Sequence, residues 1–474
     1  MTKTTMIKNA SWVVAWDGKA QTYRRDVDVV FRGGTITHVG GDYTGSVDAT
    51  VDGRGIFLLP GFVNVHSHPF CEPLYRGLRE EHGVPNMYMT GLYERMQAFM
   101  PDAPGMLAAA EVAYCELLLS GVTSIADLSP VYDGWLDLAA KSGLRVFLAP
   151  SYASASWKQR NDHVLDYDWN EKLGLKRFEE SLALIDQALA HPSGRLGGIV
   201  SPAQIDTCTI ELLEASVAAA RERKLPITTH AAQSVMEFNE MVRRHGVTPI
   251  QFAERIGLLG QNALLAHSIF IDEHSWLHWW TKRDLACLAE SGTSVAHCPT
   301  PFARYGHTLE NLGKYLRKGI NVGIGTDVAP HNIIEEMRTA AILGRIAAGD
   351  INSLTTADVL SMATVGGARA LGRADLGRIE VGARADLVLA ELDHPAMMPN
   401  RDPLRSLIYT AADRAVRDVY VDGSLVVSNR AVVNLDHMGA LHRAVEAQAR
   451  MESGTAGFGL FNRFASCILP KSFA

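Results

Sequence analysis

Four histidines and one aspartate stand at the ends of short apolar segments in this chain of 474 residues. They are His66 and His68 in "FVNVHSHPF", His230 in "ITTHAAQ", His267 in "LLAHSIF" and Asp327 in "VGIGTDVAP". Because His66 and His68 are two positions apart, they project from the same face of a strand. Imidazole and carboxylate together are typical ligands of Zn²⁺ or Fe²⁺. These residues therefore predict a metal centre if the fold brings the ends of the segments together.

A metal of this kind would supply hydrolytic chemistry. It lowers the pKa of a bound water toward about 7, which makes hydroxide available near neutral pH. Asp327 is the candidate for taking up a proton and delivering it to a leaving group. Taken singly, His267 could be a buried core histidine and Asp327 could cap the following helix. We expect one divalent metal per chain, because the segment "GGIVSPAQ" (197–204) has no lysine that could bridge a second ion. Zn²⁺ is favoured over Fe²⁺ as that metal.

The elements that must position these residues form a repeating pattern of short apolar segments and helical stretches. The segments are rich in Val, Ile, Leu and Thr, which is typical of buried parallel strands. Eight of them are predicted, at 56–68, 121–129, 143–151, 197–204, 225–233, 262–270, 292–299 and 320–330. Strand followed by helix, eight times, predicts an α/β fold of the (β/α)₈ barrel type, in which active-site residues lie at the C-terminal strand ends. A doubly wound open sheet is the alternative, weakened because no Gly-x-Gly-x-x-Gly follows the first strand.

The two ends of the chain have a different pattern. Residues 1–55 and 376–434 contain alternating apolar and polar positions with Gly-containing turns, which predicts antiparallel strands. We expect these two segments to form one small β-sandwich, with the metal-dependent barrel at 56–375 inserted between them. Residues 435–474 begin with a helical pattern and are predicted to form a C-terminal helical tail.

Composition narrows the class of protein. The chain is 47% hydrophobic and 20% charged with a formal net charge of −7, which gives no support for a nucleic-acid partner. Its six cysteines are scattered, and the N-terminus lacks the pattern of a signal peptide, so we expect a cytoplasmic protein. No stretch approaches the ~20 apolar residues of a membrane helix, so no membrane partner is expected. The expected partner is a small-molecule substrate, and a homo-oligomer is left open.

The ordered motifs "LLPGFVNVHSH", "ITTHAAQ", "LLAHSIF" and "VGIGTDVAP" resemble those of the amidohydrolase superfamily. The resemblance spans about residues 5–430 and extends to "LGRIEVGARADLVLAEL" in the C-terminal β-structure. Within the superfamily the chain is similar to the branch that contains atrazine chlorohydrolase, triazine hydrolases, phenylurea hydrolase and S-adenosylhomocysteine deaminase. The resemblance implies that His66, His68, His230 and Asp327 bind one metal. It also implies that His267 contacts the attacking water or the substrate.

Two positions depart from this branch. Relatives often carry a glutamate three residues after the fifth-strand histidine, where it protonates a ring nitrogen during deamination, but this chain has Gln233. Relatives often carry a Ser-Asn pair in the seventh-strand loop, but here Pro301 and Phe302 indicate a more apolar wall. We therefore expect a hydrolase of amide, urea, carbamate or ring-amine C–N bonds. The alternatives are a deaminase or chlorohydrolase of heteroaromatic rings, and a catalytically inactive scaffold that binds other proteins.

Position alone suggests which residues contact the substrate. Gln233 is the third candidate for catalysis beside Asp327 and His267. Candidate substrate contacts follow strands or lie in the loop after the first one: Phe70, Glu72, Tyr88, Tyr93, Gln204, Phe302, Tyr305 and His331. For each of these, ordinary packing or surface exposure is an equally good interpretation.

Overall fold

The computed structural model describes residues 2–78, 80–81, 87–159, 164–454 and 469–473. Its centre is built from two four-stranded sheets in which every pairing is parallel. One sheet has the order β14–β10–β9–β8 and the other β16–β17–β18–β19. Their strands are β8 (Phe62–Ser67), β9 (Val122–Asp127), β10 (Arg145–Leu148), β14 (Leu196–Gly198), β16 (Ile227–Ala231), β17 (Ala263–His267), β18 (Ser294–His297) and β19 (Val322–Ile324).

The two parallel sheets meet at both edges. A parallel bridge joins Ser67 to Asp327, and another joins Val200 to Ile227. Near the second edge, β11 (Ser151–Tyr152) pairs with β15 (Ser201–Pro202). Helices alternate with the strands: α2 (Ala103–Leu119), α3 (Trp135–Ser142), α4 (Glu171–Leu189), α5 (Ile210–Arg223), α6 (Val235–His245), α7 (Pro249–Arg255), α8 (Asp284–Ser291), α9 (Pro299–Arg304), α10 (Leu312–Arg317) and α11 (Ile333–Ala348).

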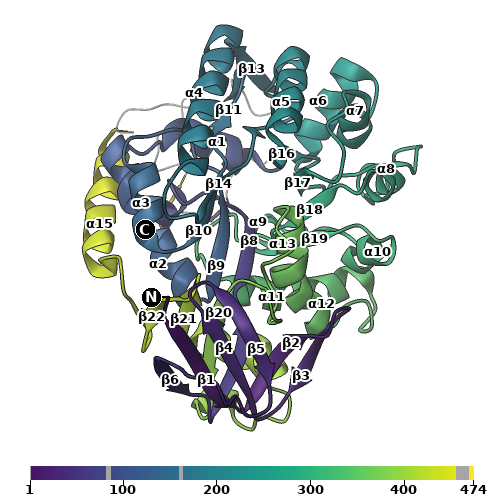
Figure 1. Ribbon diagram of the computed structural model, residues 1–474. Helices are drawn as coiled ribbons and strands as arrows, with labels where there is room; N and C mark the ends of the chain where they lie inside the picture. The colour runs from purple at the N-terminus through teal and green to yellow at the C-terminus, as the bar shows by residue number, and fades with distance from the viewer. Residues whose placement is uncertain (1, 79, 82–86, 160–163, 455–468, 474) are drawn as a thin grey trace.

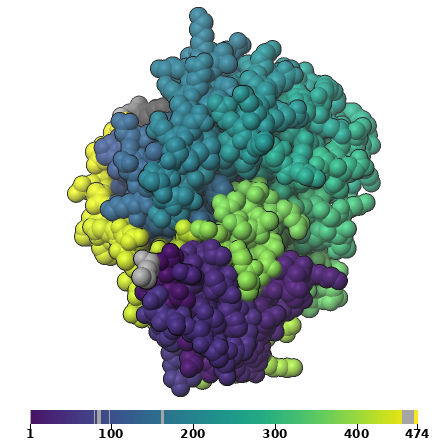
Figure 2. All heavy atoms as spheres, viewed as in Figure 1, coloured from purple at the N-terminus to yellow at the C-terminus, as the bar shows by residue number. Residues whose placement is uncertain are grey.

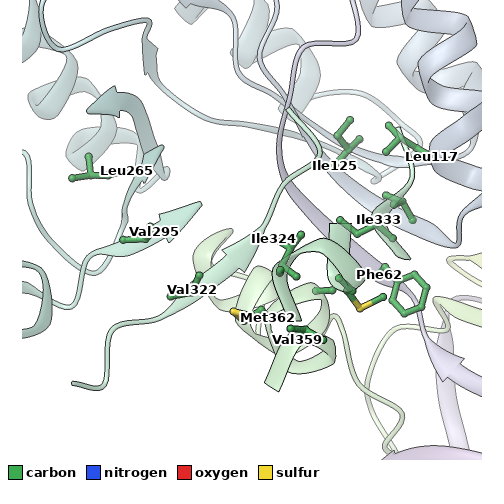
Figure 3. Packing of buried hydrophobic residues seen from close by; sticks show 14 of the residues in the cluster. Phe62, Leu117, Ile125, Leu265, Val295, Val322, Ile324, Ile333, Val359 and Met362 are labelled. Atoms are coloured by element: carbon green, nitrogen blue, oxygen red, sulfur yellow. The ribbon is translucent and has the colours of Figure 1, made fainter. Parts of the chain in front are cut away.

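The outward faces of these strands pack against the helices in one large apolar core. Ile125 of β9 lies near Leu117 of α2, and Ile324 of β19 lies near Ile333 of α11 (Figure 3). Further helical turns cover the same region, at α12 (Thr356–Ser361), η2 (Met362–Gly366) and α13 (Gly367–Ala370). Burial of these side chains supplies most of the driving force for folding and fixes the strand ends that carry polar groups.

Two further sheets stack below the parallel strands (Figure 1). The first, β5–β4–β1–β6, consists of β1 (Thr4–Ala10), β4 (Val27–Arg32), β5 (Thr35–Gly40) and β6 (Ala49–Asp52). The second combines both chain ends: β2 (Trp12–Trp16), β3 (Gln21–Arg24), β7 (Ile56–Pro60), β20 (Leu387–Glu391), β21 (Val416–Val421), β22 (Ser424–Ser428) and β23 (Ala431–Val432). A separate cluster that includes Val29, Leu58 and Leu387 fills the space between them. In Figure 2 the purple N-terminal residues form the lower end of the molecule, with green later residues beside them.

The predicted first strand, 56–68, differs from the structure. Residues 56–60 form β7, which belongs to the mixed seven-stranded sheet, and only β8 joins the parallel strands. The break falls at Gly61, whose backbone lies so close to Thr123 that an added Cβ would meet its hydroxyl at 2.2 Å. Hydrophobicity could not show this break because both strands are buried along their whole length. Residues 56–60 therefore belong to the seven-stranded sheet and not to the parallel strands.

Further elements connect the parallel strands or pack beside them. A hairpin of β12 (Ala155–Gln159) and β13 (Leu165–Trp169) follows β10 and was not expected from the sequence. After β8 come η1 (Glu72–Tyr75) and α1 (Thr90–Ala98). Within the predicted C-terminal tail at 435–474, α15 (His437–Gly454) packs on α2 and η1 along the side of the molecule (Figure 1). Residues 455–468 and 474 of that prediction lie outside the described residues. Among the helices of the described residues, none is long and apolar enough to cross a membrane.

A buried ion pair ties the parallel strands to the lower sheets. Arg145 of β10 donates from Nε to Asp386 at 2.7 Å and from Nη2 to Asp422 at 2.8 Å. Arg145 and Asp386 are 1% and 2% exposed. Asp386 immediately precedes β20, and Asp422 lies in the turn between β21 and β22. One side chain therefore links strands that are more than two hundred residues apart in sequence.

Candidate metal centre and active site

The structure brings the predicted histidines and aspartate together at the ends of four parallel strands. The Nε2 atoms of His66 and His68 lie 3.4 and 3.3 Å from Oδ1 of Asp327. The ligand atoms of His66, His230 and His267 also lie within 4.8 Å of one another. Ligands about 2.1 Å from a tetrahedral ion stand ~3.4 Å apart, so the spacing around Asp327 suits one metal ion.

A polar contact between the first and last strands fixes the position of Asp327. Asn64 donates to the hydroxyl of Thr326 at 2.8 Å, and the backbone N–H of Thr326 donates back to Asn64 at 3.1 Å. The N–H of Asp327 then donates to the carbonyl of His66 at 2.9 Å. Asp327 has a φ of 58°, a left-handed conformation uncommon outside glycine that is found in functional sites. These bonds hold its carboxylate beside His66 and His68.

Carbonyl groups orient two of the imidazoles. Nδ1 of His68 lies 2.9 Å from the carbonyl oxygen of Leu128, and Nδ1 of His230 lies 2.6 Å from that of Ala203. A carbonyl only accepts, so each Nδ1 carries the proton and each Nε2 presents a lone pair toward the cluster. His66 is fully buried, and neither of its ring nitrogens has a hydrogen-bond partner among the described residues. An unpaired buried imidazole is costly, and a metal ion would satisfy it.

Electrostatics favour the metal-binding protonation states of His230, His267 and Asp327. Burial holds the pKa of His230 and of His267 well below the ordinary histidine value, so both are neutral near pH 7. Burial alone would raise the pKa of Asp327, but the nearby imidazoles of His66 and His68 outweigh it and hold that pKa well below its usual range. Neutral imidazole and ionised carboxylate are the metal-binding forms of these side chains. The residues present therefore fit a divalent metal.

Cys298 is a neighbour of this cluster that the sequence interpretation missed. Its thiol, His267 and Asp327 have potential ligand atoms within 4.8 Å of one another. Burial raises the pKa of the Cys298 thiol well above its ordinary value, so the thiol stays protonated. A protonated thiol is a poor metal ligand. The sequence feature that could have indicated Cys298 is its position directly after the apolar segment "GTSVAH" at 292–297.

A cavity of about 100 Å³ opens beside the cluster. Its wall includes His68, His230, His267 and Asp327, so it gives a small molecule access to the candidate metal site. The other lining residues are Phe70, Cys71, Glu72, Met89, Leu92, Arg95, Met96, Trp157, Gln204, Gln233, Pro301, Phe302, Tyr305 and Val328. A larger cavity of about 720 Å³ lies between the lower sheets and α12, but none of the clustered histidines lines it.

Of the predicted substrate contacts, Phe70, Glu72, Gln204, Phe302 and Tyr305 line this cavity. Tyr88, Tyr93 and His331 are not among its lining residues. The hydroxyl of Tyr93 is 2.8 Å from that of Ser234, and the hydroxyl of Tyr88 is 2.5 Å from His307. His331 is fully buried, with its Nδ1 3.7 Å from a carboxylate oxygen of Glu116.

Gln233 faces the cavity in a fixed position. Its side-chain amide nitrogen donates to the side-chain oxygen Oε1 of Gln204 at 2.6 Å. The carboxylate of Glu237 accepts the backbone N–H groups of Ala232 and Gln233 and so holds the turn after β16. The side chain at the position where relatives often have a glutamate is thus a neutral amide paired with another amide. It can orient groups by hydrogen bonding but cannot act as an acid near neutral pH.

Comparison with known proteins places the chain among metal-dependent hydrolases. The amidohydrolase family pattern matches residues 57–426. The chain is 31% identical over 433 residues to a 5-methylthioadenosine/S-adenosylhomocysteine deaminase of Halobacterium salinarum, covering 90% of this chain and 94% of the relative. It superposes on an adenosine deaminase from Xanthomonas campestris with bound zinc (TM-score 0.80, 25% identity, 95% and 98% of the two chains). It also superposes on an atrazine chlorohydrolase from Arthrobacter aurescens TC1 complexed with zinc (TM-score 0.77, 27% identity, 94% and 100%).

Proposed function

The chain belongs to the amidohydrolase family, and from that premise we propose that it hydrolyses an amide- or urea-type C–N bond in a compact, flat small molecule. It is a metal-dependent hydrolase of carbon–nitrogen bonds other than peptide bonds. A catalytically inactive scaffold would have no physical need for a set of converging histidines beside an open cavity. The substrate class is proposed from the side chains that face that cavity.

The proposal includes a (β/α)₈ barrel with a β-sandwich from both chain ends. The two parallel sheets that meet at both edges support the barrel. The seven-stranded sheet shared by the N- and C-terminal segments supports the sandwich. A cytoplasmic location is also proposed, supported by five cysteines of the described residues that are buried and unpaired.

We assign the metal to His66, His68, His230 and Asp327. When bound, a divalent ion there lowers the pKa of water and polarises the substrate carbonyl. Asp327 accepts a proton from the attacking water through Oδ2 and passes it to the leaving nitrogen. His267, whose Nε2 lies 3.9 Å from that oxygen, donates to the developing charge on the carbonyl oxygen. The hydroxyl of the attacking water thus ends on the carbonyl carbon as the C–N bond breaks. The leaving amine carries away the other proton of that water.

The single observation that carries the substrate class is the Gln233–Gln204 amide pair. Hydrolysis of an amide or urea needs a proton only at the leaving nitrogen, which Asp327 can supply. Deamination of an aromatic ring also needs a proton on a ring nitrogen, and neither amide can provide it. The cavity of about 100 Å³ is smaller than the ~300–1,000 Å³ of most ligand clefts, which favours a single-ring substrate over a nucleoside.

A second candidate function is removal of ammonia or halide from a heteroaromatic ring. The observation that favours it is the similarity to proteins named as adenosine-type deaminases and as an atrazine chlorohydrolase. In that case another residue would have to protonate the ring.

The metal assignment predicts about one zinc per chain in protein purified from zinc-supplemented medium. His66→Ala should lose most of that zinc, because it removes a fully buried ligand whose ring nitrogens make no hydrogen bond with the described residues. Elemental analysis measures this directly. His191→Ala is the matched control, since His191 lies in the turn after α4, its ring contacts Ser193, and it does not line the cavity beside the cluster. Two tightly held ions per chain, or a wild-type zinc content in His66→Ala, would contradict the assignment.

Product analysis distinguishes the two candidate functions. We expect negligible ammonia release from amino-purines and amino-pyrimidines beside clear turnover of aryl amides or ureas in the same zinc-loaded preparation. Ammonia release from a purine or pyrimidine with kcat/KM above roughly 10⁴ M⁻¹s⁻¹ would refute the proposal in favour of deamination.

Replacing Gln233 with glutamate should add a titrating group beside the candidate metal site and change the pH dependence of kcat/KM on the amide or urea substrate. Gln187→Glu is the matched control, because Gln187 is exposed on α4 and its pH profile should remain that of the wild type. A pH profile unchanged in Gln233→Glu would show that position 233 does not face the reacting centre.

A further inference from the structure

The cavity contains a buried cation that the proposed reaction does not use. Arg95 lies on α1, is 5% exposed, and lines the same cavity as His267 and Gln233. Its Nε and Nη1 atoms make no hydrogen bond with any residue that the structure describes. A guanidinium removed from water with two donors unsatisfied is costly unless another group accepts from them.

Neighbouring residues hold this guanidinium in place without satisfying its donors. It lies 4.7 Å from the ring centroid of Tyr75, whose hydroxyl is fixed by a 2.8 Å hydrogen bond to the carbonyl of Phe99. Its Nη1 is 3.7 Å from Oε1 of Glu72, which is close enough for charge attraction and too long for a hydrogen bond. The cation is therefore both positioned and partly neutralised, while two of its buried donors have no acceptor among the described residues.

Apolar side chains line the same cavity as Arg95. They include Met89, Leu92 and Met96, and Trp157 contributes an aromatic surface. Trp157 is itself anchored, because its indole N–H donates to Asp206 at 3.0 Å. A flat substrate that packs on these side chains would place one edge toward the strand-end residues and another toward Arg95.

We propose that Arg95 determines substrate specificity by donating from its guanidinium to an uncharged carbonyl-type oxygen of the substrate, separate from the bond that is cleaved. The inference rests on the proposed function and names a second polar group on that substrate. The group is uncharged because Glu72 already balances the guanidinium, so a carboxylate would bring an unmatched negative charge into a small apolar cavity. Planar guanidinium donors match a carbonyl oxygen in geometry.

Binding of a matched series to the zinc-loaded protein tests this. The probes are 4-acetamidobenzamide, 4-acetamidobenzoate and 4-acetamidotoluene, which share one amide and differ only in the remote group. We expect the wild type to bind the carboxamide about 10-fold or more tighter than the methyl compound, since only the carboxamide can accept a charge-assisted hydrogen bond. In Arg95→Met, which keeps the side-chain length, that preference should fall to less than about 2-fold, with the affinity for the methyl compound unchanged.

Arg443→Met is the matched control, because Arg443 is a half-exposed partner of Glu111 on α15 and should leave all three affinities unchanged. Equal wild-type affinities for carboxamide and methyl probes would overturn the inference. So would Arg95-dependent preference for the carboxylate, or an Arg95→Met variant that weakens all three probes alike, as a purely structural role predicts.

The two proposals can fail separately. An Arg95-dependent carboxamide preference without hydrolysis of any probe supports this inference and counts against the proposed function. Hydrolysis of the acetamido bond without that preference counts against this inference alone.

Discussion

Replacing Asp327 with asparagine is expected to lower kcat/KM by about 10²–10⁴-fold, the range typical of a group that transfers protons. Asparagine keeps the shape of the side chain and still offers one oxygen toward His66 and His68, which lie 3.4 and 3.3 Å away. It cannot accept a proton from the attacking water. The measurement is kcat/KM on the best amide or urea substrate, with zinc content and far-UV circular dichroism recorded on the same sample.

The zinc content separates two roles of Asp327. A variant that is folded and zinc-loaded but slow shows that the carboxylate moves a proton, whereas a zinc-free variant shows that it is mainly a ligand. Asp393→Asn, at an exposed position in the loop after β20, is the matched control and should retain full activity. Turnover at the wild-type rate by zinc-loaded Asp327→Asn would rule out the assigned role.

The candidate metal cluster could be predicted from sequence because its residues stand at the ends of short apolar segments. His66, His68, His230 and Asp327 each follow a short apolar segment, and parallel strands that pack around one core must bring their ends together. The same reasoning explains why Glu72, Gln204 and Phe302 line the cavity, since each stands within a few residues of a strand end.

Residues whose position depends on long-range packing could not be predicted in this way. Arg95 reaches the cavity from α1, whose place is set by contacts such as that of Tyr93 with Ser234. Trp157 comes from the β12–β13 hairpin, where its indole N–H donates to buried Asp206 and its ring packs edge-on against Tyr93. His331 follows β19 as expected, but it turns away from the cavity toward Glu116. In each case a tertiary partner outweighs position in the sequence.

A different long-range contact yields the second large effect, which is on stability. Replacing Arg145 with leucine is expected to lower the free energy of unfolding by about 3–5 kcal/mol, the usual cost of leaving a buried charge without its partner. Asp386 would remain 2% exposed and would keep only the backbone N–H of Asp422 as a donor among the contacts seen, at 2.7 Å. The shift in the urea midpoint of zinc-loaded protein measures the loss, with two probes compared because a chain of this size need not unfold in one step.

A matched surface pair shows that burial, and not charge alone, causes the effect. Arg54 and Asp52 form an ion pair whose side chains are 75% and 58% exposed, so Arg54→Leu should leave the urea midpoint close to that of the wild type. Adding Asp386→Leu to Arg145→Leu should restore part of the lost stability, because the unpaired buried carboxylate is removed with its partner. Activity at low temperature should stay at the wild-type level in all these variants, since neither residue lines the cavity beside the metal cluster. A buried-pair variant as stable as Arg54→Leu would show that Arg145 does not hold the parallel strands to the lower sheets.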